Sequence, residues 1–538
     1  MRALLALLGF LAIVGLTVWR LQPPADYEGI DSSYVTAVLE RVASEPHPAG
    51  SAANDRVRDF LRGELQTLGF SVEEQRGELP HWRYRDRVVP IGNLVATLDG
   101  TSGSGRALML VAHFDGRDGG SRGAGDDAAG VAAVMEAARQ LAVDPPQNDV
   151  IILLTDAEEA GLLGARLWAQ ETSPSFMNVG AVVNVEGRGS RGPSILFETG
   201  RGDARLVEAY AESSPHPVAS SLGPAVYRLM PNATDFTVFR FKPGDLPAEV
   251  EERLPPLAVD LPGLNFAFVG GYEHYHQPSD TPANLSRATL LHGAARTAAL
   301  AKHLANEDLT RIRDDGDATF FDVLAFIVVR YGQPWRWAVL AACGAVAVVG
   351  IAVRARAQTA KQWMGGVGVF AAWLVAATAW AQLAGYLLPD PRAGAWFGPI
   401  WFAIAALAAM PVALLPQRWV ARTFVVAVLS LLLSAIATTA LLPGGGYLFT
   451  VAAGAGGLSL LLSGRRFGWI AVLPAIAFAT TLLAAAAWHV GLALKLGLAG
   501  VPALLLALTA ALWLPLRILP GTGEPAEKLV TAEPAPSH

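Results

Sequence analysis

The chain has 538 residues, of which 52% are hydrophobic and only 16% are charged, with a mean hydropathy of +0.36. This composition is too apolar for a single soluble protein and indicates a soluble domain joined to membrane-spanning segments. The net charge of -6 gives no reason to expect a nucleic-acid partner, and the single cysteine, Cys343, excludes an intrachain disulfide and a cysteine metal cluster.

The amino-terminal segment is apolar. Arg2 is followed by a mostly apolar stretch from Ala3 to Trp19, which is near the length needed to cross a bilayer. A cleaved signal peptide is the alternative, but the stretch is long for the apolar core of such a peptide, and no Ala-x-Ala precedes residues 21–24. We therefore predict an uncleaved membrane anchor over residues 1–20.

Residues 28–312 have the composition of an ordinary globular domain. Apolar runs that predict strands alternate with patterned runs that predict helices, which is typical of an α/β fold with a largely parallel core sheet. The predicted strands cover 71–75 at an edge, 88–96, 107–112, 150–155, 179–185, 195–198 and 264–269, and the predicted helices cover 54–68, 127–141, 160–170, 203–214 and 286–305.

The character of the chain changes after Asp317. Segment 318–332 is apolar but short and carries Asp322 and Arg330, so we predict an interfacial segment along the membrane surface. We predict a seven-span membrane domain over residues 336–516 and a disordered tail over residues 517–538. The middles of the spans contain almost no ionisable residue, which disfavours an ion-coupled transporter. The seven apolar runs cover 336–353, 364–388, 395–415, 421–442, 446–463, 468–488 and 497–516, and the anchor makes eight spans.

Lysine and arginine residues are distributed unequally among the predicted loops. If the amino terminus is cytoplasmic, the outer loops between spans hold only Arg392 and Lys495. The positive-inside rule then places the α/β domain outside the cytoplasm, in the periplasm of a bacterium or the lumen of a eukaryotic compartment. The inner loops hold Arg354, Arg356, Lys361, Arg418, Arg422, Arg465, Arg466 and Arg517.

Polar residues follow four of the predicted strands at their carboxyl ends, where ligands gather in open α/β sheets. Helix capping explains a single acid before a helix. It does not explain four successive strand ends that carry histidines and acids. The set comprises His113, Asp115, Asp126, Asp127, Asp156, Glu158, Glu159, Glu186, His274 and His276.

Part of this set can hold two divalent cations that share one carboxylate. Oxygen and imidazole ligands without thiolate suit Zn²⁺, with Mn²⁺ or Co²⁺ as substitutes. Glu158 remains free to take a proton from a shared water, and Asp115 is placed to accept the second ring N–H of His113. The predicted ligands, with one histidine and one acid for each ion and one bridging acid, are His113, Asp126, Glu159, Glu186 and His276.

Five motifs in order resemble the di-zinc aminopeptidase family that includes aminopeptidase Y and bacterial leucyl aminopeptidases. The motifs are AHFD, GAGDDAAG, TDAEEAGLLGA, NVEG and HYHQPSDT. The resemblance covers about residues 30–310 and implies a phosphorylase/hydrolase-like three-layer domain with a central mixed sheet. It also implies a division of roles: His113 and Glu186 on one zinc, Glu159 and His276 on the other, Asp126 between them and Glu158 as the general base.

Two departures from the family pattern matter. Glu186 stands where soluble members often have Asp, and segment 233–240, ATDFTVFR, replaces the Ser-Asp-His pattern of many soluble relatives. The second departure leaves the substrate pocket unassigned. Together with the carboxyl-terminal spans, both departures resemble the membrane-anchored branch, which contains endoplasmic-reticulum metallopeptidase and vacuolar membrane protease.

The leading prediction is a membrane-anchored zinc aminopeptidase, in which a metal-bound hydroxide attacks the first peptide bond and Glu158 is the base. Its expected partners are a peptide substrate and membrane lipid, and the sequence does not identify a protein partner. A glutaminyl cyclase-like enzyme with one zinc is the enzymatic alternative, disfavoured by the complete set of five ligands. A non-catalytic receptor or scaffold on the same fold is disfavoured because no ligand is lost.

Overall fold

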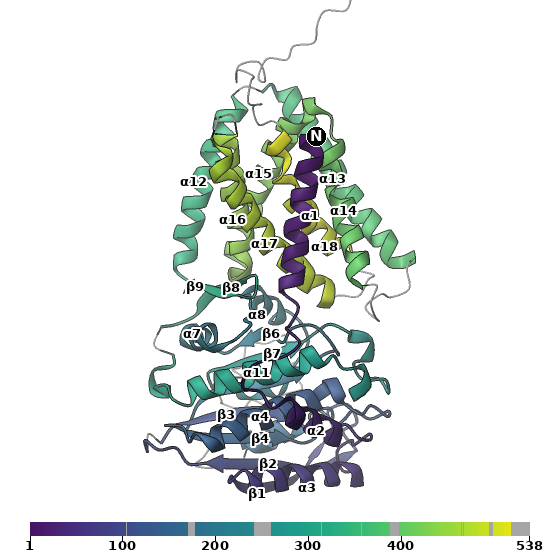
Figure 1. Ribbon diagram of the computed structural model, residues 1–538, viewed down its shortest axis with the longest axis vertical. Coiled ribbons are helices and arrows are strands. Elements are labelled where there is room, and N and C mark those ends of the chain that lie inside the picture. The colour runs from purple at the N-terminus through teal and green to yellow at the C-terminus, as the bar shows by residue number, and fades with distance from the viewer. Residues whose placement is uncertain are drawn as a thin grey trace, which may run out of the picture. The chain divides into compact units, whose positions relative to one another are not determined.

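The computed structural model describes residues 1–103, 105–170, 178–240, 260–313, 315–356, 358–387, 397–463, 465, 467–493 and 499–517. Apart from Arg517, the predicted disordered tail lies outside the described residues. The chain divides into two compact units (Figure 1). An α/β unit is formed by Leu21–Gln333, and a helical unit is formed by Met1–Arg20 with the chain from Pro334 onward.

The described part of the α/β unit contains one large mixed sheet, in the order β1-β2-β4-β3-β5-β7-β6. The four strands β4, β3, β5 and β7 are parallel neighbours, whereas β1, β2 and β6 are antiparallel strands at the two sides. The predicted strands and the largely parallel core are confirmed. The bounds are β1 (Ser71–Pro80), β2 (Val88–Leu98), β3 (Ala107–His113), β4 (Asp149–Thr155), β5 (Val179–Gly187), β6 (Ile195–Thr199) and β7 (Gly263–Phe268).

Helices cover both faces of this sheet and make a three-layer domain. Because both faces are covered, the central strands are apolar throughout, and alternate side chains point to opposite faces. In β3, Leu110 joins the core on one face and Met109 joins the core on the other. The first face carries α2 (Ser32–Val42), α4 (Ala129–Val143), α7 (Ala204–Ser213) and α11 (Arg287–Leu304), and the second carries α5 (Leu163–Gln170) and α9 (Asp235–Phe239).

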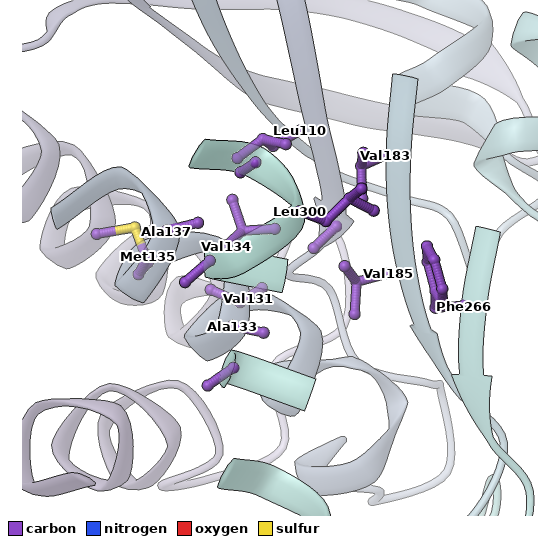
Figure 2. Packing of buried hydrophobic residues seen from close by; sticks show 14 of the residues in the cluster. Leu110, Val131, Ala133, Val134, Met135, Ala137, Val183, Val185, Phe266 and Leu300 are labelled. Carbon is purple, nitrogen blue, oxygen red and sulfur yellow. The ribbon is translucent and has the colours of Figure 1, made fainter. Parts of the chain in front are cut away.

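The core of the first face is built from aliphatic side chains. Figure 2 shows Val134 of α4 and Leu300 of α11 in the cluster with Leu110 and Val183 of the sheet. All four side chains are fully buried. Each such residue contributes roughly 1.5–3 kcal/mol by leaving water, so this layer anchors the strands whose ends carry the polar residues.

Several helix boundaries differ from the predictions. The helix predicted from residue 127 begins at Ala129, because Asp126 and Asp127 have non-helical backbone angles in a turn over Ala124–Ala128. The helix predicted from residue 160 begins at Leu163, because the chain first makes a turn in which Leu162 has a positive φ. The sequence pattern did not predict α2, whereas α3 (Ala52–Thr67) agrees with its predicted range.

The segment predicted to be interfacial forms a β-hairpin of β8 (Ala318–Val323) and β9 (Ile327–Gly332). Arg330 of β9 forms an ion pair with Glu208 of α7. The α/β unit therefore extends to Gln333, beyond residue 312. Contact of the hairpin with a membrane surface stays a prediction.

The helical unit corrects the predicted number of spans. Within the described residues, six helices rather than eight are long and apolar enough to cross a membrane, and two shorter apolar helices accompany them. The helices are α1 (Arg2–Arg20), α12 (Trp335–Ala355), α13 (Ala360–Leu387), α14 (Phe397–Leu414), α15 (Gln417–Leu441), α16 (Gly446–Leu462), α17 (Trp469–Ala493) and α18 (Gly500–Ala511).

The two shorter helices are Ile400–Leu414, within α14, and α18. The apolar run predicted at 497–516 is interrupted, because α18 ends at Ala511 and Leu514–Arg517 forms a separate short helix that contains Pro515. With 12 residues, α18 is about 18 Å long, whereas the hydrocarbon core of a bilayer is about 30 Å thick. Residues 494–498, just before α18, lie outside the described residues.

Candidate metal centre

The carboxyl ends of neighbouring parallel strands bring the predicted ligands together. His113 is the last residue of β3, and Glu186 lies near the end of β5. Glu159 follows β4, and His276 follows β7. Since these four strands are parallel neighbours, their carboxyl ends lie along one edge of the sheet. Asp126 reaches the same place from the loop between β3 and α4.

Asp126 lies between two histidines. Its Oδ1 is 3.2 Å from Nε2 of His113, and its Oδ2 is 3.1 Å from Nε2 of His276. His276 Nε2 also lies 3.2 Å from Glu159 Oε1, and His113 Nε2 lies 3.8 Å from Glu186 Oε2. One carboxylate thus joins two histidine–acid pairs, which is the grouping that two cations with a shared ligand require. Metal binding by these residues stays a prediction.

Buried oxygen atoms in this cluster show that the residues fit divalent cations. Among the described residues, Asp126 Oδ2, Asp127 Oδ2 and Glu159 Oε1 are buried and accept no hydrogen bond. Such atoms are costly unless a positive charge compensates them. Two groups have ligand atoms within 4.8 Å of one another, namely His113, Asp127 and Glu186, and Asp126, Glu159 and His276. These imidazole and carboxylate donors suit zinc.

Asp127 caps helix α4 and also lies beside the predicted metal ligands. Its Oδ1 accepts the N–H of Gly130 at 3.1 Å, in the first turn of α4, as a helix cap does. Its carboxylate also belongs to the group with His113 and Glu186. Burial raises the pKa of Asp127 well above its ordinary value, and Glu186 raises it further. Asp127 is therefore both a cap and a neighbour of the metal ligands.

Without a bound cation, the buried groups of this cluster hold protons more tightly than they would in water. Burial raises the pKa of Glu186 to about 8 and raises the pKa of Glu158 well above its ordinary range. Burial alone would lower the pKa of His113, but hydrogen bonds with Asp115 and Asp126 raise it well above the ordinary value. Cations and protons compete for such groups, so the binding of metal would release these protons.

Asp115 holds the turn that carries the two adjacent glutamates. Its Oδ1 accepts the N–H of Glu158 at 2.9 Å, and its Oδ2 accepts the N–H of Glu159 at 3.3 Å. The predicted contact with His113 is looser, since His113 Nδ1 lies 3.2 Å from the carbonyl oxygen of Asp115 and 3.4 Å from Oδ1. Ala157, just before the turn, has a φ of 57°, an uncommon conformation that often occurs at functional sites.

Three further residues position the ligands. Asp280 accepts the N–H groups of Gly125 and Asp126, at 2.7 and 3.2 Å, and so fixes the loop that carries the shared acid. Asn184 donates to Glu186 Oε1 at 3.1 Å, and Arg117 donates to Glu159 Oε2 at 2.8 Å. The period of two in a strand places Asn184 on the face of Glu186, but no spacing rule links Arg117 to Glu159.

The remaining candidates lie outside the cluster. His274 Nδ1 lies 3.0 Å from Ser279 Oγ. Asp156 fixes the end of β4, because Oδ1 accepts the N–H of Ala157 at 2.8 Å and Oδ2 accepts that of Gly92 at 3.0 Å. Asp156 therefore supports the local backbone, and His274 contacts a neighbouring side chain.

Two hollows adjoin the cluster. One has a volume of about 170 Å³, and its lining includes Glu158, Glu159, Leu162, Tyr275 and His276. The other has a volume of about 220 Å³, and the two share Trp82, Arg117 and Glu159 as a common wall. The predicted base and two predicted ligands are therefore open to a small molecule. Such a site, at the strand ends of a three-layer α/β unit, places possible metal ligands beside a space for a small molecule.

The model of Peptidase family M28 matches residues 93–301 of the chain. The matched range contains all five predicted ligands and Glu158. The resemblance that the five motifs indicated is confirmed at the level of the family.

Two curated relatives are peptidases by name. The chain is 27% identical over 306 residues to a vacuolar membrane protease of Candida dubliniensis, covering 55% of this chain and 30% of that protein. It is 25% identical over 354 residues to endoplasmic reticulum metallopeptidase 1 of Mus musculus, covering 61% and 37%. The chain thus matches about a third of the length of these relatives.

Solved structures of two kinds are also similar to the chain. A zinc-dependent exopeptidase from Parabacteroides distasonis is 19% identical, with a TM-score of 0.39 over 51% of this chain and 98% of that one. A glutaminyl cyclase from Porphyromonas gingivalis is 16% identical, with the same TM-score over 50% and 97%. These likenesses do not distinguish a peptidase from a cyclase.

Proposed function

We propose that the protein is a membrane-anchored, zinc-dependent exopeptidase that hydrolyses the amino-terminal bond of peptides. The observation that carries this proposal is the position of Asp126 between His113 and His276, beside Glu158, which lines a hollow. His113 and Glu186 would hold one zinc ion, and Glu159 and His276 the other. Asp126 would be shared between the two ions.

The chemistry of the reaction divides between the cations and Glu158. Bound zinc ions would polarise the peptide carbonyl and acidify a water molecule. Glu158 would accept the proton from that water and give it to the departing amine. Because burial raises the pKa of Glu158, its carboxylate is a stronger base than an exposed glutamate. Leu162 and Tyr275 line the hollow around it and limit the access of solvent.

The electrostatics of the hollow favour the amino terminus of a peptide. Glu158 and Glu159 both line it, and a positively charged amine is attracted to carboxylates in a partly buried place. The positively charged Arg117 lines both hollows, but it is paired with Glu159 Oε2 at 2.8 Å, whereas Glu158 has no such partner among the described residues. An amino end would therefore lie toward Glu158, with the rest of the substrate beyond it.

A metal count on the purified full-length chain tests this proposal. We expect two zinc ions per chain, hydrolysis of aminoacyl chromogenic substrates, loss of hydrolysis with a chelator and recovery when zinc is returned. His113→Ala should lose metal. His274→Ala is the matched control, because His274 lies in the same region but outside the cluster, and it should retain both ions.

The same measurement separates the cyclase alternative. A glutaminyl cyclase-like enzyme would hold one tightly bound ion, close rings on amino-terminal glutamine and leave the aminoacyl substrates intact. One ion per chain that is unchanged in His113→Ala would overturn the two-metal proposal. Two bound ions without hydrolysis of any peptide would favour a non-catalytic receptor.

A further inference from the structure

The larger hollow beside the metal ligands has a basic and aromatic wall. Its volume is about 220 Å³, and its lining includes Arg83, Arg87 and Arg117 together with His81, Trp82 and Tyr84. Most of this wall belongs to the loop between β1 and β2, residues 81–87. The hollow meets the metal cluster at Glu159 and Asp115.

Hydrogen bonds hold the 81–87 loop in one shape. The N–H of His81 donates to the carbonyl of Arg87 at 2.8 Å, and the N–H of Arg87 donates to the carbonyl of Tyr84 at 2.9 Å. The N–H of Trp82 donates to the carbonyl of Ala160 at 3.1 Å, which fastens the loop to the turn of the two glutamates. A rigid wall pays little conformational entropy when it binds a ligand.

His81 lines the hollow and has one ring nitrogen that can donate a hydrogen bond. Its Nδ1 accepts the backbone N–H groups of Arg83 and Tyr84, at 3.0 and 3.3 Å. An imidazole nitrogen that accepts two N–H groups carries no hydrogen, so Nε2 carries it. His81 is mostly buried, and it lines the hollow.

The acids at this hollow already have partners. Both oxygens of Asp115 accept the N–H groups of the glutamate turn. Asp118 forms an ion pair with Arg87 at 2.8 Å, and Glu159 forms one with Arg117 at 2.8 Å. Arg83 lies over the ring of Trp82, with 4.7 Å from its guanidinium carbon to the ring centroid. It has no acidic partner within the described part of the chain.

We propose that this hollow binds a carboxylate of the peptide substrate through Arg83 and Arg87, with the Nε2–H of His81 as a third donor. Arginine presents paired N–H donors that match a carboxylate. Trp82 and Tyr84 provide an apolar surface for the aliphatic part of the substrate residue that carries the carboxylate. The proposal rests on the proposed peptidase function, because the hollow shares Glu159 with the metal cluster.

A carboxylate can come from an acidic side chain or from the carboxyl terminus of a short peptide. Four substrates separate these sources: Leu-Ala-amide without a carboxylate, Glu-Ala-amide and Leu-Glu-amide with one in a side chain, and Leu-Ala with a free carboxyl terminus. At least one carboxylate peptide should have a higher kcat/KM than Leu-Ala-amide. Which peptide is preferred identifies the source.

Substitutions in the loop then test the two arginines. Arg83→Gln combined with Arg87→Gln should raise KM for the preferred peptide roughly 10- to 100-fold, the worth of a charged hydrogen bond. The kcat/KM for Leu-Ala-amide should stay unchanged. Arg85→Gln is the control: it removes one positive charge from the same exposed loop, but Arg85 does not line the hollow.

A binding measurement separates failure of this proposal from failure of the proposed function. Glu158→Gln, which should not turn over substrate, is titrated calorimetrically with the same four peptides. A carboxylate preference that the double arginine variant abolishes supports the subsite even if the protein hydrolyses none of the peptides. Equal binding and equal kcat/KM for all four peptides would overturn it, as would a preference that survives the double substitution.

Discussion

Glu158 and Glu159 are neighbours in sequence with different surroundings. Glu159 Oε1 lies 3.2 Å from His276 Nε2, and its Oε2 accepts a hydrogen bond from Arg117 at 2.8 Å. Glu158 is half-buried, and desolvation raises its pKa well above the ordinary value. These surroundings favour the proposed role of Glu159 as a metal ligand and that of Glu158 as the group that exchanges a proton.

We expect the substitutions Glu158→Gln and Glu159→Gln to have different effects. Glu158→Gln keeps the shape of the side chain but cannot accept a proton, so kcat should fall roughly 10²–10⁴-fold with both metals retained. Glu159→Gln removes an anionic ligand and should lose metal as well as rate. Metal content and turnover are measured on each variant.

The reverse pattern would exchange the two roles. If Glu158→Gln loses metal while Glu159→Gln keeps it, Glu158 is the ligand and Glu159 the base. Near-normal turnover in both variants would contradict the hydrolytic mechanism itself.

The candidate ligands at the strand ends could be predicted from the sequence, but the residues that position them could not. Histidines and acids after four strands indicate ligands, because the edge of a parallel sheet brings strand ends together whatever the loops do. The contact of Arg117 with Glu159 depends on how two loops fold over each other, and no local pattern encodes that. Asp115 was expected to serve His113, yet its two oxygens accept the N–H groups of the glutamate turn.

At the scale of elements, β3 carries both core and site. Leu110 is fully buried at its middle, three residues before His113. Leu110→Ala should lower the free energy of unfolding of the α/β unit by about 2–5 kcal/mol, because a cavity replaces the side chain. Scanning calorimetry of the full chain in detergent measures this change in the transition of the α/β unit.

Val72→Ala is the control for that experiment. Val72 lies on the edge strand β1 and is only partly buried, so its substitution should have a clearly smaller effect. Equal shifts for both variants would mean that β3 is not the centre of the cooperative core.

The hairpin of β8 and β9 was not predicted from the sequence, and the residues of its turn show why. Tight hairpins usually contain glycine, asparagine or aspartate in the turn, where φ is positive. Here Leu324 and Ala325 occupy those positions, with φ of 56° and 50°. An apolar segment without a turn residue gives no hairpin signal, so composition alone suggested a membrane-surface segment. The central strands gave a clear signal because they are long, apolar and bounded by polar loops.

At the scale of the whole molecule, the side of the membrane on which the α/β unit lies can be tested directly. We propose that the α/β unit lies on the non-cytoplasmic side, because Arg354, Arg356 and Lys361 flank the junction of α12 and α13 and such charges favour the cytoplasm. Cys343 is the only cysteine in the sequence, so its replacement by serine gives a background without thiols. Single cysteines are then introduced by Ser33→Cys and Thr359→Cys.

An impermeant maleimide applied to right-side-out membrane vesicles should label Ser33→Cys and leave Thr359→Cys unlabelled until detergent is added. Both sites are exposed in the structure, so a lack of label reports the membrane barrier. Labelling of both sites on one side would mean that α12 does not cross. Labelling of Thr359→Cys alone would invert the orientation.

The helical unit is assembled from two distant parts of the chain. Gly15 of α1 lies against Phe402 of α14, and Gly9 lies against Trp513. About 380 residues separate the end of α1 from the start of α14. At a synthesis rate of about 5–20 residues per second, α14 is therefore made roughly 20 to 80 s after α1. The α/β unit, continuous from Leu21 to Gln333, leaves the ribosome within that interval. The α/β unit can therefore fold before α14 and the later helices that pack against α1 have been synthesised.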